Sequence, residues 1–215
     1  MFNLPKGPLI GSLYICGILV EKDRIKELKN IGVKDSKELK KNEREELESK
    51  IKKIAKDFKI VKITPKEIDE RASVGMNLNH LEAIKMAEII NTLKPDVAII
   101  DCPSHNTNAF KKFLEKYLEH KCKLKVENYA DESYVTVGAA SILAKVERDR
   151  EIEKISKELG IELYNGYPND EKALELVKNL EKIPGARKYI RSSWYTYKRI
   201  EEEKNLRKQK KILDF

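Results

Sequence analysis

Hydrophobic residues along this 215-residue chain alternate between short apolar runs and stripes with helical spacing. The apolar runs predict strands at residues 9–20, 58–63, 96–101 and 123–129. Between and after these runs, apolar residues three or four positions apart predict amphipathic helices. Such an alternation of strands and helices is typical of an α/β protein, so we expect a mixed sheet flanked by helices and followed by a helical C-terminal section.

Residues 9–20 are apolar at nearly every position, which predicts a strand covered on both faces. Within that run, Gly11 and Gly17 predict a bend or a bulge. Residues 58–63 alternate with lysines, so one face of this strand is expected to be wet or to lie at an edge of the sheet.

Capping signals mark where several helices should begin. Thr64 followed by Pro65 predicts the start of a short helix. Asp35 or Ser36 is expected to cap a long charged helix. Asn79 with Glu82 has the spacing of a capping box at the start of another helix. A further helix is expected to begin at Ser141, after a small-residue stretch.

Two aspartates, Asp101 and Asp131, follow neighbouring strand-like runs, so both are expected at strand ends. Ligands usually bind at such ends in an open α/β sheet. Carboxylate oxygens are hard ligands that suit Mg²⁺ or Mn²⁺, and two such metals can promote phosphodiester cleavage. The alternative interpretation is that both are surface aspartates that cap turns.

The helix after Asp131 carries a polar stripe that suits phosphate. Ser141, Lys145 and Arg148 stand at positions i, i+4 and i+7, which share one helix face. A hydroxyl and two cations near a helix N-terminus can bind phosphate. The alternative is a surface helix with solvated charges.

Composition narrows the class of protein. A formal net charge of +8, from 44 Lys and Arg against 36 Asp and Glu, permits a polyanionic partner without requiring one. Three cysteines without paired spacing argue against a disulfide framework or a zinc site. The longest apolar run is too short to span a bilayer, and no signal-peptide pattern is present. We therefore expect a cytoplasmic protein with no membrane partner.

Several motifs together resemble the ribonuclease HII family, the type 2 ribonucleases H. The resemblance runs from Gly7 to about Ile200. It rests on the following segments: GPLIG at 7–11, GVKDSKEL at 32–39, IDE at 68–70, IIDC at 99–102, AD at 130–131 with AASILAKVERD at 139–149, GYPND at 166–170 and SSWYTYKRI at 192–200. The AASILAKVERD segment is the most specific of these.

The resemblance implies a ribonuclease H-like fold with a five-stranded mixed sheet at residues 1–160 and a helical section at 161–215. It implies an endoribonuclease that cuts the RNA strand of RNA–DNA hybrids, and DNA at embedded ribonucleotides, leaving 3′-hydroxyl and 5′-phosphate ends. Asp101 and Asp131 match two metal-binding, catalytic carboxylates, for Mg²⁺ or Mn²⁺. Tyr167 matches a tyrosine that senses the ribonucleotide. The implied nucleic-acid contacts are Lys6, Gly7, Lys34, Ser36, Lys37, Ser141, Lys145, Arg148 and Tyr167.

The N-terminus departs from the family pattern. Family members have a central strand followed by DEAGRG, whose two acids supply the other metal ligands. Aligned backwards from Gly7, the six positions hold Phe2, Asn3, Leu4, Pro5, Lys6 and Gly7, without either acid. An altered start, a degenerate paralogue and a shortened strand are three alternative explanations. The functional alternative is therefore an impaired relative that binds RNA–DNA hybrid without cutting it. A monomer is expected in either case.

Overall fold

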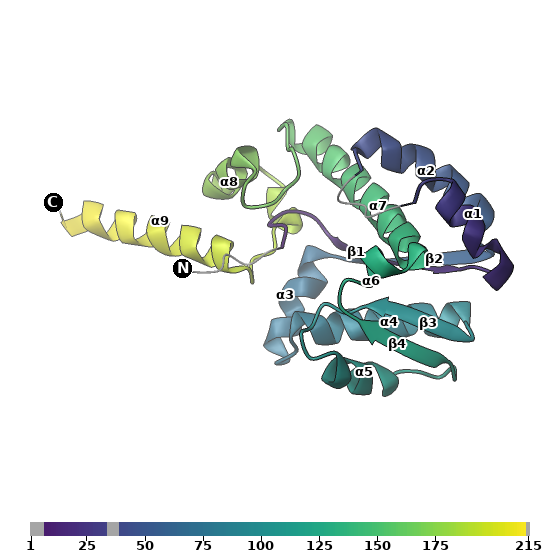
Figure 1. Ribbon diagram of the computed structural model, residues 1–215. Helices are drawn as coiled ribbons and strands as arrows, with labels where there is room; N and C mark the ends of the chain where they lie inside the picture. Colours follow the sequence, from purple (N-terminus) through teal and green to yellow (C-terminus); the bar gives the residue numbers. More distant parts are fainter. Residues whose placement is uncertain (1–6, 34–38, 214–215) are drawn as a thin grey trace. The chain divides into compact units, whose positions relative to one another are not determined.

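The computed structural model describes residues 7–33 and 39–213, and it is a mixed α/β structure with a helical C-terminal region (Figure 1). The chain forms two compact units, each of which is described by itself. The first comprises residues 1–13, 63–75 and 148–215, and the second comprises residues 14–62 and 76–147. The division near residue 160 that was expected from the sequence stays a prediction.

The second unit contains two strand pairs. Strand β1 (Leu13–Leu19) pairs with β2 (Asp57–Ile63), and β3 (Val97–Asp101) pairs with β4 (Lys123–Glu127). The described ranges thus hold four of the five strands that the resemblance implies. The two pairs are those expected on either side of the family's central strand. Within the described residues, the two pairs form two separate two-stranded sheets.

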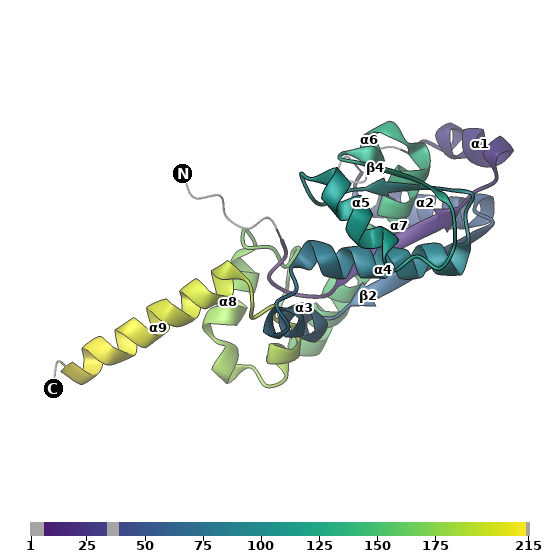
Figure 2. The same ribbon diagram turned by 90° about the horizontal axis from the view of Figure 1, so that it is seen from below.

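Helices of the second unit pack against both strand pairs. The helices are α1 (Ile25–Asn30), α2 (Lys41–Ile54), α4 (Leu78–Leu93), α5 (Thr107–Glu115), α6 (Ala130–Ser133) and the first part of α7 (Val135–Leu159). One cluster joins α1, α2 and α7, with Leu28, Ile51 and Ile142 fully buried and Cys16 of β1 packed against it. A second cluster joins α4 and α5 to β3 and β4 (Figure 2).

Gly17 of β1 is explained by close packing rather than by the bend or bulge that the sequence suggests. It lies within β1, and a methyl group placed on its Cα would stand 2.4 Å from Cγ2 of Ile89 on α4. Gly11 does have a positive φ of +87°, a conformation that favours glycine. The two glycines therefore serve different purposes, a close helix approach at Gly17 and a backbone turn at Gly11.

The first unit contains α3 (Pro65–Ser73), the second part of α7, α8 (Glu171–Lys178), α9 (Tyr195–Leu213) and 3₁₀ turns at Leu180–Lys182 and Ala186–Tyr189. Its N-terminal segment forms an antiparallel bridge between Ile10 and Ile190. The fully buried Arg191 donates from Nε to the carbonyl of Gly11 at 2.8 Å. Buried Glu151 accepts both the backbone and hydroxyl protons of Ser12. The GPLIGS segment is thereby fixed to the C-terminal part of the chain.

The capping predictions have mixed outcomes. The Thr64 cap is confirmed, because its hydroxyl accepts the Glu67 backbone N–H while the Glu67 carboxylate accepts that of Thr64. The Asn79 prediction is wrong, since α4 begins at Leu78 and Asn77 is its N-cap. The long helix α2 begins at Lys41, after an N-cap at Lys40. Asp35 and Ser36, the two expected caps, lie outside the described residues.

Within residues 7–33 and 39–213, none of the helices combines the length and apolar character needed to cross a bilayer. Cys16, Cys102 and Cys122 are all free thiols, as expected.

Candidate functional site

The carboxylate of Asp101 lies at the end of a parallel strand pair. Asp101 is the last residue of β3, as expected, and it pairs in register with Glu127 at the end of β4. Its Oδ1 accepts the backbone N–H of Ala130 at 3.1 Å. Because Ala130 immediately precedes Asp131, this hydrogen bond brings the backbone beside Asp131 to the side chain of Asp101.

Asp131 lies on a short helix, whereas the sequence predicts that it ends a strand. The prediction that it ends a strand is wrong: β4 stops at Glu127, and Asp131 belongs to the short helix α6. Tyr129, with φ +58°, turns the chain between strand and helix. The side-chain amide of Asn128 donates to the carbonyls of Cys102 and Ser104, both at 2.8 Å, which fixes the turn to the end of β3. A left-handed tyrosine persists only where its surroundings impose it.

Two carboxylates are a suitable donor set for one Mg²⁺ or Mn²⁺ ion. Mg²⁺ keeps several waters and takes one or two protein carboxylates together with substrate phosphate. Asp131 is 7% exposed, which limits the number of waters that surround it. In the part of the chain that the structure describes, no three His, Cys, Asp or Glu side chains gather as a metal-binding group. Among the described residues, a hard ion at this place would therefore have at most these two carboxylates as protein ligands.

The stripe that is expected to bind phosphate lies on α7, a 25-residue helix. The helix begins at Val135 rather than at Ser141, so the small residues Gly138, Ala139 and Ala140 are helical. Ser141 and Lys145 are partly exposed on it. Of the other expected nucleic-acid contacts, Lys6, Lys34, Ser36 and Lys37 lie outside the described residues.

Arg148 and Tyr167, both in the first unit, lie against each other. The guanidinium carbon of Arg148 is 4.6 Å from the centroid of the Tyr167 ring. One nitrogen of Arg148 also donates to the carbonyl of Asn165, whose side-chain oxygen accepts the Tyr167 backbone N–H at 2.9 Å. The Arg148 side chain is only 11% exposed, and its guanidinium also lies 3.4 Å from the carboxylate of the neighbouring Asp149.

Gly7 packs against an aromatic side chain from the same unit. A methyl group added to Gly7 would come within 2.8 Å of the Trp194 ring, so only glycine fits without displacement of the ring. Trp194 in turn lies under the guanidinium groups of Arg71 and Arg191, at 5.5 and 5.2 Å. The contact is a second reason for glycine at position 7, besides the nucleic-acid role expected from the resemblance.

Asp170 is a buried carboxylate that was not singled out from the sequence. Its Oδ2 accepts the backbone N–H groups of Tyr164, Asn165 and Gly166, each at 2.9 Å. Burial opposes ionisation, but the hydrogen bonds from the backbone outweigh it, so the pKa of Asp170 lies below its ordinary value. The signal in the sequence is an aspartate placed directly before a helical stripe, in the GYPND segment.

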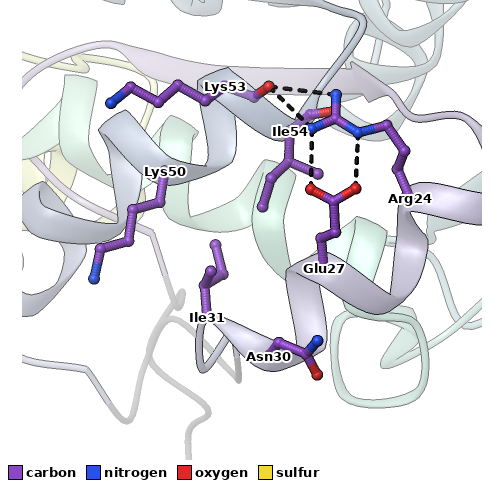
Figure 3. Close-up of a pocket in the computed structure, with 7 residues that line it drawn as sticks. All are labelled: Arg24, Glu27, Asn30, Ile31, Lys50, Lys53 and Ile54. Atoms are coloured by element: carbon purple, nitrogen blue, oxygen red, sulfur yellow. Dashed lines mark hydrogen bonds and ion pairs between the residues drawn. The ribbon is translucent and has the colours of Figure 1, made fainter.

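A shallow pocket of 390 Å³ lies elsewhere in the second unit, at the end of α2 (Figure 3). There Arg24 forms two hydrogen bonds with the carboxylate of Glu27 and donates to the carbonyl of Ile54 at 2.8 Å. A cation at the C-terminal carbonyls of a helix is an ordinary stabilising arrangement. None of the residues expected to act on nucleic acid lines this pocket.

Comparison with known proteins gives a consistent result. The family model described as Ribonuclease HII matches residues 5–197. Ribonuclease HII of Pyrococcus furiosus is 41% identical over 97% of this chain and 93% of its own. The ribonuclease H2 structure from Pyrococcus horikoshii superimposes with a TM-score of 0.82, at 36% identity, over 94% of this chain and 95% of that one. A chain in the PCNA:RNase HII complex from Archaeoglobus fulgidus has a TM-score of 0.75 at 36% identity, over 84% of this chain and 86% of its own.

Proposed function

Because the chain belongs to the ribonuclease HII family, the metal-dependent endoribonucleases that cut the RNA strand of RNA–DNA hybrids, we propose that Asp101 and Asp131 hold its catalytic metal. The observation that carries the proposal is the hydrogen bond from Ala130 to Asp101, which brings the backbone beside Asp131 to the side chain of Asp101 at the end of β3. Mg²⁺ or Mn²⁺ bound there would supply an activated water and neutralise charge on the scissile phosphate.

The protein side chains have defined parts in this proposal. Oδ1 of Asp101 is held by the Ala130 N–H, so the carboxylate is oriented before any ligand binds. Asp131 adds a second negative charge, carried on a buried turn of helix that restricts its rotation. Hydrolysis of the phosphodiester bond at a ribonucleotide then leaves a 3′-hydroxyl and a 5′-phosphate.

Further residues are proposed to recognise the substrate. Tyr167 is proposed to stack beside the ribonucleotide, with Arg148 against its ring. Ser141 and Lys145 on α7 are proposed to bind phosphate of the nucleic-acid backbone. The further proposed backbone contacts are Lys6, Gly7, Lys34, Ser36 and Lys37.

The test is cleavage of a duplex that contains one ribonucleotide, with an all-DNA duplex of the same sequence as the control. In Mn²⁺ or Mg²⁺ we expect one cut, with the 5′-phosphate on the downstream product, and no cut after chelation of the metal. Binding of the duplex without any product in either metal would contradict the proposal.

For partners and location, we propose a monomer that acts in the cytoplasm and binds PCNA. The support for this partner is the similarity to a chain solved in a PCNA:RNase HII complex. Gel filtration with PCNA tests this: the chain should co-elute with PCNA, and elution of the two proteins as separate peaks would contradict the proposal.

A further inference from the structure

Asp170 makes more hydrogen bonds than a helix cap requires. Its Oδ1 accepts the N–H groups of Lys172 and Ala173, at 3.1 and 3.3 Å, which is the ordinary N-capping arrangement for α8. Its Oδ2 accepts three further N–H groups from the preceding loop, each at 2.9 Å. The side chain is 5% exposed, so these bonds are formed away from bulk water.

The three loop residues bonded by Oδ2 are Tyr164, Asn165 and Gly166. Asn165 and Gly166 in turn make hydrogen bonds that fix the loop around Tyr167. Asn165 accepts the Tyr167 N–H through its side chain and a proton of Arg148 through its carbonyl. The carbonyl of Gly166 accepts the N–H groups of Leu9 and Ile10, at 2.8 and 3.1 Å. Gly166 has φ +69° and is buried, so the loop crosses the N-terminal segment in a fixed conformation.

A loop fixed in this way restricts the ring of Tyr167 from two directions. Asn165 fixes its backbone, and the Arg148 guanidinium lies 4.6 Å from the ring centroid. Both restraints depend on the position of Asn165, and that position is set by Asp170. The ring itself remains partly exposed, so it is available for contact with a ligand.

We propose that Asp170 is a positioning residue for ribonucleotide recognition, which acts by holding Tyr167 and Arg148 in their relative places. The inference rests on the proposed function, in which Tyr167 contacts the ribonucleotide. A carboxylate is required because one oxygen receives three N–H groups while the other caps α8, and no neutral side chain offers two such acceptors. Loss of the loop bonds lets the tyrosine move and weakens its stacking on the substrate.

A role in stability alone is the competing explanation, and a double-mutant cycle separates the two. Asp170→Ser keeps a good N-cap for α8 but is too short to hold the three loop N–H groups. Tyr167→Ala removes the ring through which Asp170 is proposed to act. If Asp170 acts through Tyr167, the fold-change of the double variant is smaller than the product of the two single fold-changes. If the two residues act independently, the single fold-changes multiply.

The cycle is measured as kcat/KM for a duplex with one ribonucleotide, and as the Kd of the same duplex in Ca²⁺ by fluorescence anisotropy. Tyr167→Ala should lower kcat/KM by about 10- to 100-fold, the range expected for loss of one stacking contact. Asp170→Ser should lower it by about 10-fold, mainly through KM, and the double variant should match Tyr167→Ala within about twofold. If the fold-changes of Asp170→Ser and Tyr167→Ala multiply in the double variant in both assays, the inference is overturned.

Asp69→Asn is the matched control, because Asp69 also bonds two backbone N–H groups, those of Ser192 and Ser193, at 2.8 Å each. The fold-change caused by Asp69→Asn should multiply with the fold-change caused by Tyr167→Ala. If Asp170→Ser does not fold, Asp170→Asn, which has the same shape, takes its place in the cycle. A wild-type chain that binds but does not cleave would contradict the proposed function, and the Kd cycle would still decide the role of Asp170.

Discussion

The close approach of α4 to β1 gives a sharp test of the packing in the second unit. Gly17→Ala would place a methyl group 2.4 Å from Cγ2 of Ile89 and 3.3 Å from Cδ1 of Leu93. Ordinary contacts begin at 3.4 Å, so the Ile89 side chain must retreat by about 1 Å. Ile89 and Leu93 are buried, at 5% and 8% exposure, so neither has free space to move into.

Overpacking of this kind costs about 1–3 kcal/mol of unfolding free energy. For a chain of this size, that cost lowers the Tm by about 2–10 °C, which circular dichroism measures directly. Ile89→Ala removes the clashing atom and is itself destabilising, by about 2–5 kcal/mol. The double variant should therefore lose less stability than the two single variants added together.

The coupling between the two sites is the decisive quantity. We expect Gly17→Ala to cost little or nothing when Ile89 is already alanine, a coupling of about 1–3 kcal/mol. An unchanged Tm for Gly17→Ala, or strict additivity in the double variant, would refute the explanation that Gly17 exists to admit α4.

Three further predictions concern other parts of the chain. Burial raises the pKa of Cys16 to about 12, so iodoacetamide at pH 8 should label Cys16 much more slowly in the native protein than in the unfolded one, as followed by mass spectrometry; equal rates would contradict this. Asp170 has a lowered pKa, so its contribution to stability is complete above the ordinary carboxyl pKa of about 4 and is lost as the pH falls through the lower folded-state value. The Tm difference between wild type and Asp170→Asn should shrink from pH 7 to pH 3; a constant difference would argue against the ionised carboxylate. Thr64→Ala removes one half of the α3 capping box and should cost about 0.5–2 kcal/mol in urea unfolding, whereas Thr64→Ser should cost less.

Element types in the second unit were readable from the sequence, but helix starts were less so. Residues 96–101 gave a strand that the structure places at Val97–Asp101. The sequence predicts a later start for α7 because Gly138 lowers helix propensity, whereas in the structure Ala139 packs into a buried cluster and stabilises the preceding turn. Either Asn77 or Asn79 can cap a helix, and only the hydrogen bond to the N–H of His80 decides between them.

The sequence likewise predicts only part of the candidate site. Asp101 was predictable because it ends an apolar run. The location of Asp131 on a helix depends on the left-handed Tyr129 and on the bonds that Asn128 makes across the loop, which no local pattern indicates. The contact between Glu151 and Ser12 spans 139 positions along the chain, so it is visible only after folding.

The central claim is that Asp101 and Asp131 carry metal-dependent cleavage at a ribonucleotide. Single-turnover cleavage of a labelled duplex in Mn²⁺ tests it most directly, with wild type, Asp131→Asn and the exposed control Asp23→Asn compared at equal bound fractions. We predict cleavage by wild type and by the control. For Asp131→Asn we predict a rate lower by at least about 100-fold, because the asparagine leaves one ligand charge where the metal needs two. An unchanged rate for Asp131→Asn would contradict the account.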